Sequence, residues 1–171
     1  MSGVWETQMR HVLVTALATV LVPGVAVLVI PYLILRGTGS PAAPEVGFIQ
    51  ALALALALVG AGMVAWVSVT FVTKGKGTPV PVAPPENLVA EGLYRFVRNP
   101  MYFGALLTLF GEAAFFRSPW ILLYAGMLWL ALHTFTVLLE EPQLEQRFGD
   151  PYREYKARTP RWFPRRPSKM P

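Results

Sequence analysis

The sequence predicts an all-α membrane protein with about four transmembrane helices and a C-terminal amphipathic helical segment. Three observations support this fold class. Of the 171 residues, 54% are hydrophobic and only 15% are charged, and the apolar residues gather in four long stretches. So few charges cannot cover the surface of a soluble domain of this length. We therefore expect residues 1–171 to form one integral membrane domain.

The four expected spans cover residues 11–35, 46–73, 98–116 and 118–139. A helix needs about 20 apolar residues to cross a hydrocarbon core about 30 Å thick. The third stretch falls short of this, so we expect it to start at the polar residues before it, to thin the bilayer, or to pair tightly with the fourth. Only Arg117 and its neighbours separate these two spans, which predicts an antiparallel hairpin whose outer ends return to one membrane face.

Prolines and glycines within the first two spans carry structural predictions. Pro23 and Pro31 each remove a backbone hydrogen bond, so we expect a kink and neighbouring helices that satisfy the freed carbonyls. Residues 51–58 alternate Ala and Leu as a strand can, but an open strand edge cannot lie in lipid, and helix is predicted. Gly60 and Gly62 follow in the same stretch and are expected to let helices pack closely.

The distribution of basic residues predicts the orientation. Of the 15 Lys and Arg residues, only Arg36 and Arg117 fall on one side of the expected bundle. The positive-inside rule then places both termini and the polar tail, residues 142–171, in the cytoplasm. The basic run from Arg165 onward is expected to attract anionic membrane lipids. No recognition fold for nucleic acid accompanies this charge.

The polar tail has the pattern of short amphipathic helices. Gly149 is expected to stop one helix and Asp150 to cap the next. Its apolar residues recur at steps of four, four and three, which predicts a segment that lies on the membrane or packs under the bundle: Leu144, Phe148, Tyr152 and Tyr155.

A polar stretch that opens the third span is the first candidate for chemistry. Asn99 is a favoured N-cap residue and Pro100 suits the first helical position, so a helix is predicted to begin there. Its free N–H groups, the positive end of the helix dipole and Arg98 form a seat for a carboxylate or phosphate. The alternative is a capped helix start whose Arg98 faces lipid phosphates.

A pair of carboxylates, Glu140 and Glu141, is the second candidate. It lies at the expected end of the fourth span, where the helix dipole disfavours acidic side chains. The hairpin returns the pair to the same face as Arg98, so we expect a pocket with one cationic wall and one carboxylate wall. Such a pocket suits a zwitterionic ligand. The alternative is a structural ion pair between one glutamate and Arg98 or Arg147.

These segments together resemble the isoprenylcysteine carboxyl methyltransferase and phospholipid methyltransferase superfamily. The resemblance rests on GLYRFVRNPMYFG at 92–104, the glutamate pair and FGDPYREY at 148–155, and it covers about residues 77–164. Members are integral membrane enzymes that use S-adenosylmethionine without a soluble Rossmann-like domain. The resemblance implies that seven residues line the cofactor pocket, which the distribution of basic residues places on the cytoplasmic face of the membrane: Arg98, Asn99, Pro100, Tyr102, Gly104, Glu140 and Glu141.

Two positions depart from the family pattern. Asn99 stands where the family has a histidine, and an amide cannot titrate near neutral pH, so we assign no general base. Thr136 stands where the prenylcysteine enzymes carry an arginine thought to meet the substrate carboxylate. This difference argues against a prenylcysteine carboxylate as the methyl acceptor.

Two ionisable residues inside the expected spans, Glu112 and His133, are functional candidates by default. At about 1.5 Å per residue they rise roughly 15 and 10 Å from the cytoplasmic end, so we expect them to meet across the hairpin. With Thr136 they are candidates for contact with the acceptor. The chain has no cysteine and two histidines, and no residues with metal-ligand spacing, so no metal is predicted.

Two hypotheses of function follow. The first is S-adenosylmethionine-dependent methyl transfer to a lipophilic small molecule or lipid that enters from the bilayer. The acceptor atom and the oligomeric state stay open. The second, motivated by Asn99, is a non-catalytic lipid-binding or assembly protein related to the same family. A small transporter, suggested by Glu112 and His133, is a weaker third, because no internal repeat is evident.

Overall fold

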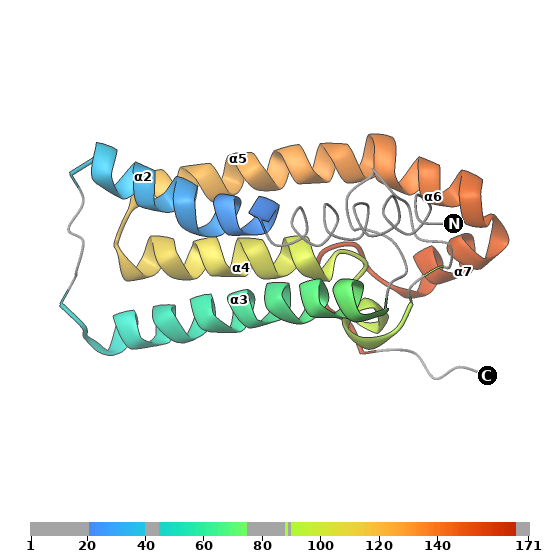
Figure 1. Ribbon diagram of the computed structural model, residues 1–171, viewed down its shortest axis with the longest axis horizontal. Coiled ribbons are helices and arrows are strands. Elements are labelled where there is room, and N and C mark those ends of the chain that lie inside the picture. The colour runs from blue at the N-terminus through green and yellow to red at the C-terminus, as the bar shows by residue number, and fades with distance from the viewer. Residues whose placement is uncertain (1–20, 40–44, 75–87, 89, 167–171) are drawn as a thin grey trace, which may run out of the picture.

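The protein is an elongated bundle of helices, with the short helices Glu141–Phe148 and Asp150–Arg158 at one end (Figure 1). The computed structural model describes residues 21–39, 45–74, 88 and 90–166, and the regular structure within these ranges is entirely helical. The elements, with π and 3-10 segments labelled η, are η1 (Val25–Val29), α2 (Ile30–Gly37), α3 (Phe48–Lys74), η2 (Gly92–Arg95), α4 (Pro100–Phe115), α5 (Pro119–Phe135), η3 (Thr136–Glu140), α6 (Glu141–Phe148) and α7 (Asp150–Arg158).

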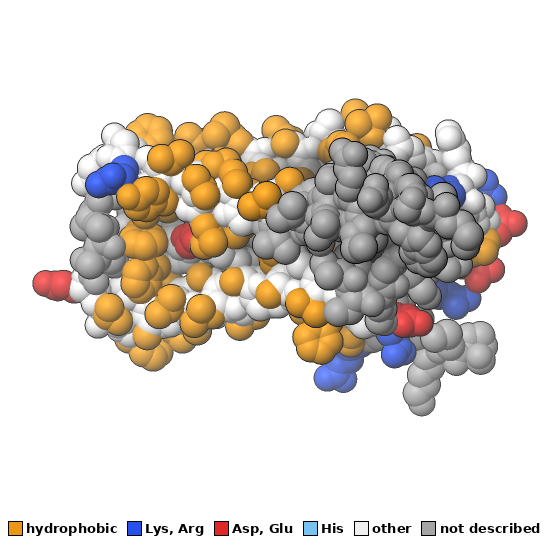
Figure 2. All heavy atoms as spheres, in the orientation of Figure 1, with side chains coloured by type: hydrophobic (Ala, Val, Ile, Leu, Met, Phe, Trp, Pro, Cys, Tyr) orange, Lys and Arg blue, Asp and Glu red, His pale blue; other side chains and the backbone are white. Residues whose placement is uncertain are grey.

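Two helices are long and apolar enough to cross a membrane by length and composition, namely Phe48–Thr70 and Pro119–Phe148. The helices Leu21–Gly37 and Pro100–Phe115 are apolar but shorter. Two of the four expected spans therefore reach membrane length within the described residues. The first expected span begins at residue 11, outside the described residues. Apolar side chains cover much of the described bundle surface in Figure 2, and charged ones gather mainly toward its two ends.

Helices α3 and α4 pack backbone against backbone because glycines meet between them. A Cβ atom on Gly60 would lie 2.5 Å from the carbonyl oxygen of Gly104, and one on Gly111 would lie 2.5 Å from the backbone nitrogen of Ala57. The prediction of close packing is thus confirmed at Gly60. It is wrong at Gly62, where an added Cβ would meet nothing within 4 Å.

Helices α4 and α5 form the predicted antiparallel hairpin (Figure 1). Arg117 takes a positive φ of 50° in the turn, and the Ser118 side chain caps α5 by accepting from the N–H of Ile121 at 3.4 Å. Ile121 is fully buried and packs with Leu109 in the apolar core. The hairpin therefore carries the outer ends of both helices to the same end of the bundle.

The fourth expected span does not end near residue 139. Helix α5 continues through η3 into α6, so one unbroken helix runs from Pro119 to Phe148. Gly149, with φ 59°, ends it as predicted. The predicted cap by Asp150 is wrong, because its carboxylate accepts from Arg153 Nη1 at 2.7 Å and makes no cap hydrogen bond.

Two π-helical segments, η1 and η3, share one cause. In each case a proline, which has no N–H to donate, stands two residues after the last residue of the segment. Ile30 donates its N–H to the carbonyl of Val25. The next carbonyl, that of Ala26, would have to accept from Pro31, which has no N–H. The Tyr124 hydroxyl on α5 donates to this carbonyl at 3.0 Å. The prediction that a neighbouring helix satisfies a carbonyl freed by Pro31 is confirmed.

At η3 the same arrangement recurs without a tyrosine. Glu141 donates its N–H to the carbonyl of Thr136, and the next residue is Pro142. The wide turn lets the helix pass the proline without a break. It also inserts one extra residue, which turns the side chains that follow by about 100° relative to an uninterrupted α-helix. Glu140 and Glu141 sit at this point.

Candidate functional site

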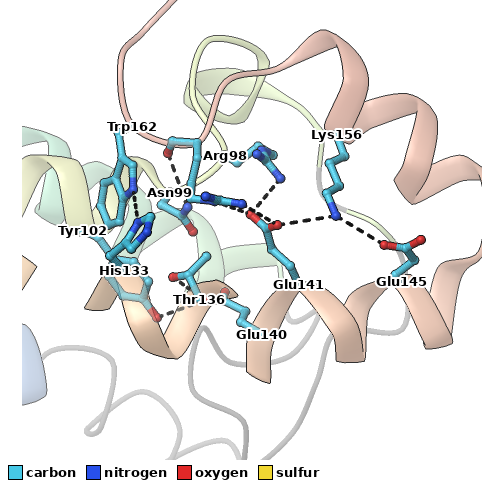
Figure 3. A network of polar contacts seen from close by, with 11 residues as sticks. Arg98, Asn99, Tyr102, His133, Thr136, Glu140, Glu141, Glu145, Lys156 and Trp162 are labelled. Carbon is cyan, nitrogen blue, oxygen red and sulfur yellow. Dashed lines mark hydrogen bonds and ion pairs between the residues drawn. The ribbon is translucent and has the colours of Figure 1, made fainter. Parts of the chain in front are cut away.

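The site is built where the start of α4 meets the end of η3 (Figure 3). The Tyr102 hydroxyl donates to Glu140 Oε2 at 3.5 Å, and Thr136 Oγ1 donates to the same oxygen at 3.4 Å. The structure thus brings together the two segments that the sequence placed on one face. Thr136 is buried, and its hydroxyl faces Glu140 rather than an open space.

The second glutamate, Glu141, forms ion pairs with three basic side chains. Its Oε1 accepts from Arg98 Nη1 at 2.8 Å and from Arg161 Nε at 2.6 Å. Its Oε2 accepts from Arg161 Nη2 at 2.9 Å and lies 3.6 Å from Lys156 Nζ. The side chain is only 6% exposed. The expected alternative of a structural ion pair is therefore what this glutamate forms in the structure, and the Glu141 carboxylate raises the pKa of Arg161.

Residues 159–165, which we call the C-terminal strap, lie over the start of α4. The strap makes two backbone hydrogen bonds to the loop before α4: Arg98 N–H to Pro160 O at 2.9 Å, and Arg165 N–H to Phe96 O at 3.0 Å. The Asn99 side chain donates from Nδ2 to Arg161 O at 3.3 Å. The prediction of an Asn99 side-chain cap is wrong, because the amide binds the strap instead.

An aromatic cluster anchors the strap to α5. Trp162 Nε1 donates to His133 Nδ1 at 3.0 Å, and the Trp129 ring stacks on His133 at a centroid distance of 5.4 Å. An indole N–H can only donate, so His133 Nδ1 carries a lone pair, and the proton of the neutral ring is on Nε2. His133 has therefore no free basic nitrogen in this arrangement.

Buried tyrosines close the polar end of the bundle. The Tyr155 hydroxyl of α7 donates to Tyr94 O at 2.8 Å, and Tyr152 is buried. Burial first, and the Glu141 carboxylate second, raise the pKa of Tyr152 to about 12, and burial raises the pKa of Tyr155. Both phenols stay neutral at physiological pH and act as hydrogen-bonding packing groups.

Glu112 lies away from this cluster, and the expected contact with His133 is wrong. Residues of an antiparallel hairpin meet when they are equally far from its turn. Glu112 is close to the Arg117 turn and His133 is far beyond it, so Glu112 is level with the region of Tyr124 instead. The Oε2 atom of Glu112 is buried without a hydrogen-bond partner among the described residues.

Two further residues of the predicted cofactor set serve the fold. Pro100 is buried at the first turn of α4, as predicted. A Cβ on Gly104 would lie 2.9 Å from Gly60 O, so this glycine permits the contact with α3. Both shape the wall behind Tyr102.

The sequence alone did not reveal Arg161 and Lys156 as partners of the site, nor Trp162 as a partner of His133. One signal could have found the cations. Two adjacent carboxylates at the edge of an apolar stretch need cationic partners, and the polar tail that follows them carries most of the basic residues expected on that side. Beside Glu141 lies an open hollow of about 350 Å³, with Val137, Glu141, Pro142, Glu145, Gln146, Arg153 and Lys156 on its walls.

A helical bundle with two helices of membrane-spanning length and a cluster of charged side chains at one end defines a class: helical membrane proteins with a polar site at the end of the bundle. The family follows from comparison with known proteins. The chain belongs to the phospholipid methyltransferase family, whose model matches residues 50–151. This match includes Tyr102, Glu140 and Glu141 and stops before the strap.

A curated relative adds a second comparison. Over 90 residues the chain is 34% identical to methanethiol S-methyltransferase 1 of Bradyrhizobium diazoefficiens. The matched region covers 50% of this chain and 29% of the relative. The chain thus aligns with less than a third of that protein. The two comparisons agree on a family of methyltransferases.

Proposed function

We propose that the protein is an S-adenosylmethionine-dependent methyltransferase that acts on a lipophilic small molecule or lipid entering from the bilayer. The observation that carries this proposal is the contact of Tyr102 with Glu140 inside the segment matched by the methyltransferase family. We place the cofactor site on the cytoplasmic face, with both termini on that side and the basic run from Arg165 onward against anionic lipids.

The side chains present fit the proposed cofactor. Arg98 Nε is buried without a hydrogen-bond partner among the described residues, and three cations surround the single carboxylate of Glu141. Lys156 is shared with Glu145, but Arg98 and Arg161 alone outnumber Glu141. This positive charge and the free N–H suit the carboxylate of S-adenosylmethionine. Glu140, held only by the long contacts to Tyr102 and Thr136, suits its ammonium or ribose hydroxyls. The bound cofactor would supply a methyl group activated on sulfur.

The protein's own task is then alignment and exclusion of water. Transfer from a sulfonium needs an in-line approach in a dry pocket, and positioning can supply most of the rate. The site agrees with this, because His133 Nδ1 is occupied by Trp162 and Asn99 by the strap. Because the site offers no assigned base and the thiolate, not the thiol, is the nucleophile, an acceptor that arrives already deprotonated, such as a small thiolate or an unprotonated lipid amine, suits this site best.

Cofactor binding is the direct test. Purified full-length protein in nanodiscs should bind S-adenosylmethionine saturably. Glu140→Gln should weaken binding about 10-fold or more, because a charge-assisted hydrogen bond contributes about 1.5–3 kcal/mol. Glu154→Gln is the matched control, since this carboxylate is 69% exposed and pairs only with Arg158 among the described residues. Wild-type protein without saturable binding would contradict the proposal.

The second candidate is a non-catalytic lipid-binding or assembly protein. It is favoured by the hydrogen bond from Asn99 to the strap, because this side chain stands where the family has a histidine and serves the fold instead. Transfer of labelled methyl groups into a total lipid extract and into a panel of small thiols separates the two. Cofactor binding without transfer to either pool would favour the non-catalytic protein.

A further inference from the structure

The two adjacent glutamates have opposite environments. Glu141 is buried and its two oxygens receive hydrogen bonds or ion pairs from three cations, all at 3.6 Å or less. Among the residues that the structure describes, Glu140 has only neutral partners, Tyr102 and Thr136, at 3.5 and 3.4 Å on one oxygen. A carboxylate offers about four acceptor directions. Glu141 has these filled by the protein, whereas Glu140 keeps acceptor capacity for a ligand.

The partners of Glu141 come from three separate parts of the chain. Arg98 precedes α4, Lys156 lies on α7, and Arg161 lies on the strap. Arg161 alone binds both oxygens, in the two-pronged geometry that a lysine cannot provide. Glu141 therefore ties the strap and α7 to the turn of η3 that also carries Glu140.

The strap has a second attachment on the same helix. Trp162 Nε1 binds His133, which lies two turns before Glu141. The two attachments flank the π-helical turn on its N-terminal and C-terminal sides. A wide turn has poorer hydrogen bonding than an α-helix and needs such support to hold one register.

We infer that Arg161 is a positioning residue of the proposed site: through Glu141 it locks the π-helical turn, so that Glu140 alone of the pair faces the cofactor. This inference rests on the proposed function. It makes the strap, which lies outside the segment matched by the family model, a part of the site. It divides the glutamate pair into one carboxylate that touches the ligand and one that holds the first in place.

The binding test uses a double-mutant cycle on full-length protein, with S-adenosylmethionine as the probe. Arg161→Gln and Glu141→Gln should each weaken binding about 3- to 10-fold, less than Glu140→Gln. The double variant should bind no more weakly than Glu141→Gln alone, because the two residues act as one unit. Arg161→Lys should fall between wild type and Arg161→Gln. Arg158→Gln, which removes an arginine that is 51% exposed and pairs with Glu154, is the matched control and should leave affinity within about 2-fold.

A second readout does not need the cofactor. The chain has no cysteine, so Phe163→Cys, at a strap residue that is 82% exposed, accepts a single spin label. The label should become more mobile in Arg161→Gln and stay unchanged in Arg158→Gln. This measurement also decides the matter if Glu141→Gln fails to fold.

The outcomes separate the two proposals. Absence of cofactor binding by wild-type protein would overturn the proposed function, and the spin label would still report whether Arg161 holds the strap. Wild-type affinity in Arg161→Gln, losses that multiply in the double variant, or an unchanged label would each overturn the positioning role.

Discussion

The two π-helical turns of this protein have the same origin and different surroundings. In η1 the wide turn lies in the apolar bundle, and Tyr124 replaces the hydrogen bond that Pro31 cannot make. In η3 the wide turn lies at the polar end and Pro142 creates it; Glu140 is its last residue and Glu141 follows directly. The comparison shows two outcomes of the same wide turn. In η1 a neighbouring side chain supplies the missing hydrogen bond, whereas in η3 the turn sets the direction of two carboxylates.

The largest expected effect comes from Pro142→Ala, which tests whether the wide turn aims the carboxylates. Alanine would give residue 142 an N–H and let the helix return to α-helical register, turning Glu141 away from Arg161. We expect cofactor affinity to fall more than 10-fold with little change in helix content, measured by ligand titration and circular dichroism. Pro151→Ala, at an exposed first-turn proline of α7, is the control. Unchanged affinity would show that register does not matter.

A smaller effect is expected at the other turn. Tyr124→Phe removes the hydroxyl that serves the Ala26 carbonyl. An unsatisfied carbonyl in apolar surroundings costs about 1–3 kcal/mol, so the free energy of unfolding in detergent should fall by that amount while cofactor affinity stays the same. Tyr32→Phe changes a tyrosine that is 54% exposed and should cost far less. Equal losses in both variants would contradict the account.

The smallest effect is expected when both changes at η1 are combined. Pro31→Ala supplies an N–H within the helix, so Tyr124→Phe in this background should cost less than about 0.5 kcal/mol. The measurement is the same unfolding titration, read as a coupling energy between the two positions. If Tyr124→Phe lowers the free energy of unfolding equally with Pro31 and with Ala at that position, its hydroxyl does not replace the missing proline donor.

The parts of this architecture that depend on local patterns were predictable from the sequence. The hairpin follows from the short polar break at Arg117, and the hairpin in turn places Tyr102 beside Glu140. The likeness of this region to a methyltransferase family was also readable, and the family match confirms it. Periodicity and turn chemistry act over a few residues, so one chain can reveal them.

Features that depend on long-range return of the chain were not predictable. Arg161 reaches Glu141 only because the strap folds back over the start of α4, and no local pattern encodes that path. The π-helical turns were missed for a different reason. A proline inside an apolar helix predicts a kink, but whether the chain bends or widens depends on the donors that neighbouring helices offer. Glu112 was misplaced because its level was counted from the wrong end of the hairpin.

The glycine contacts between α3 and α4 limit how the site can admit a lipophilic molecule. At Gly60, Gly104 and Gly111 the two backbones touch without side chains between them, so sliding one helix along the other would drive atoms into contact. The wall that carries Tyr102 is therefore stationary. Under the proposed function, the lipophilic acceptor must therefore enter by another side of the bundle.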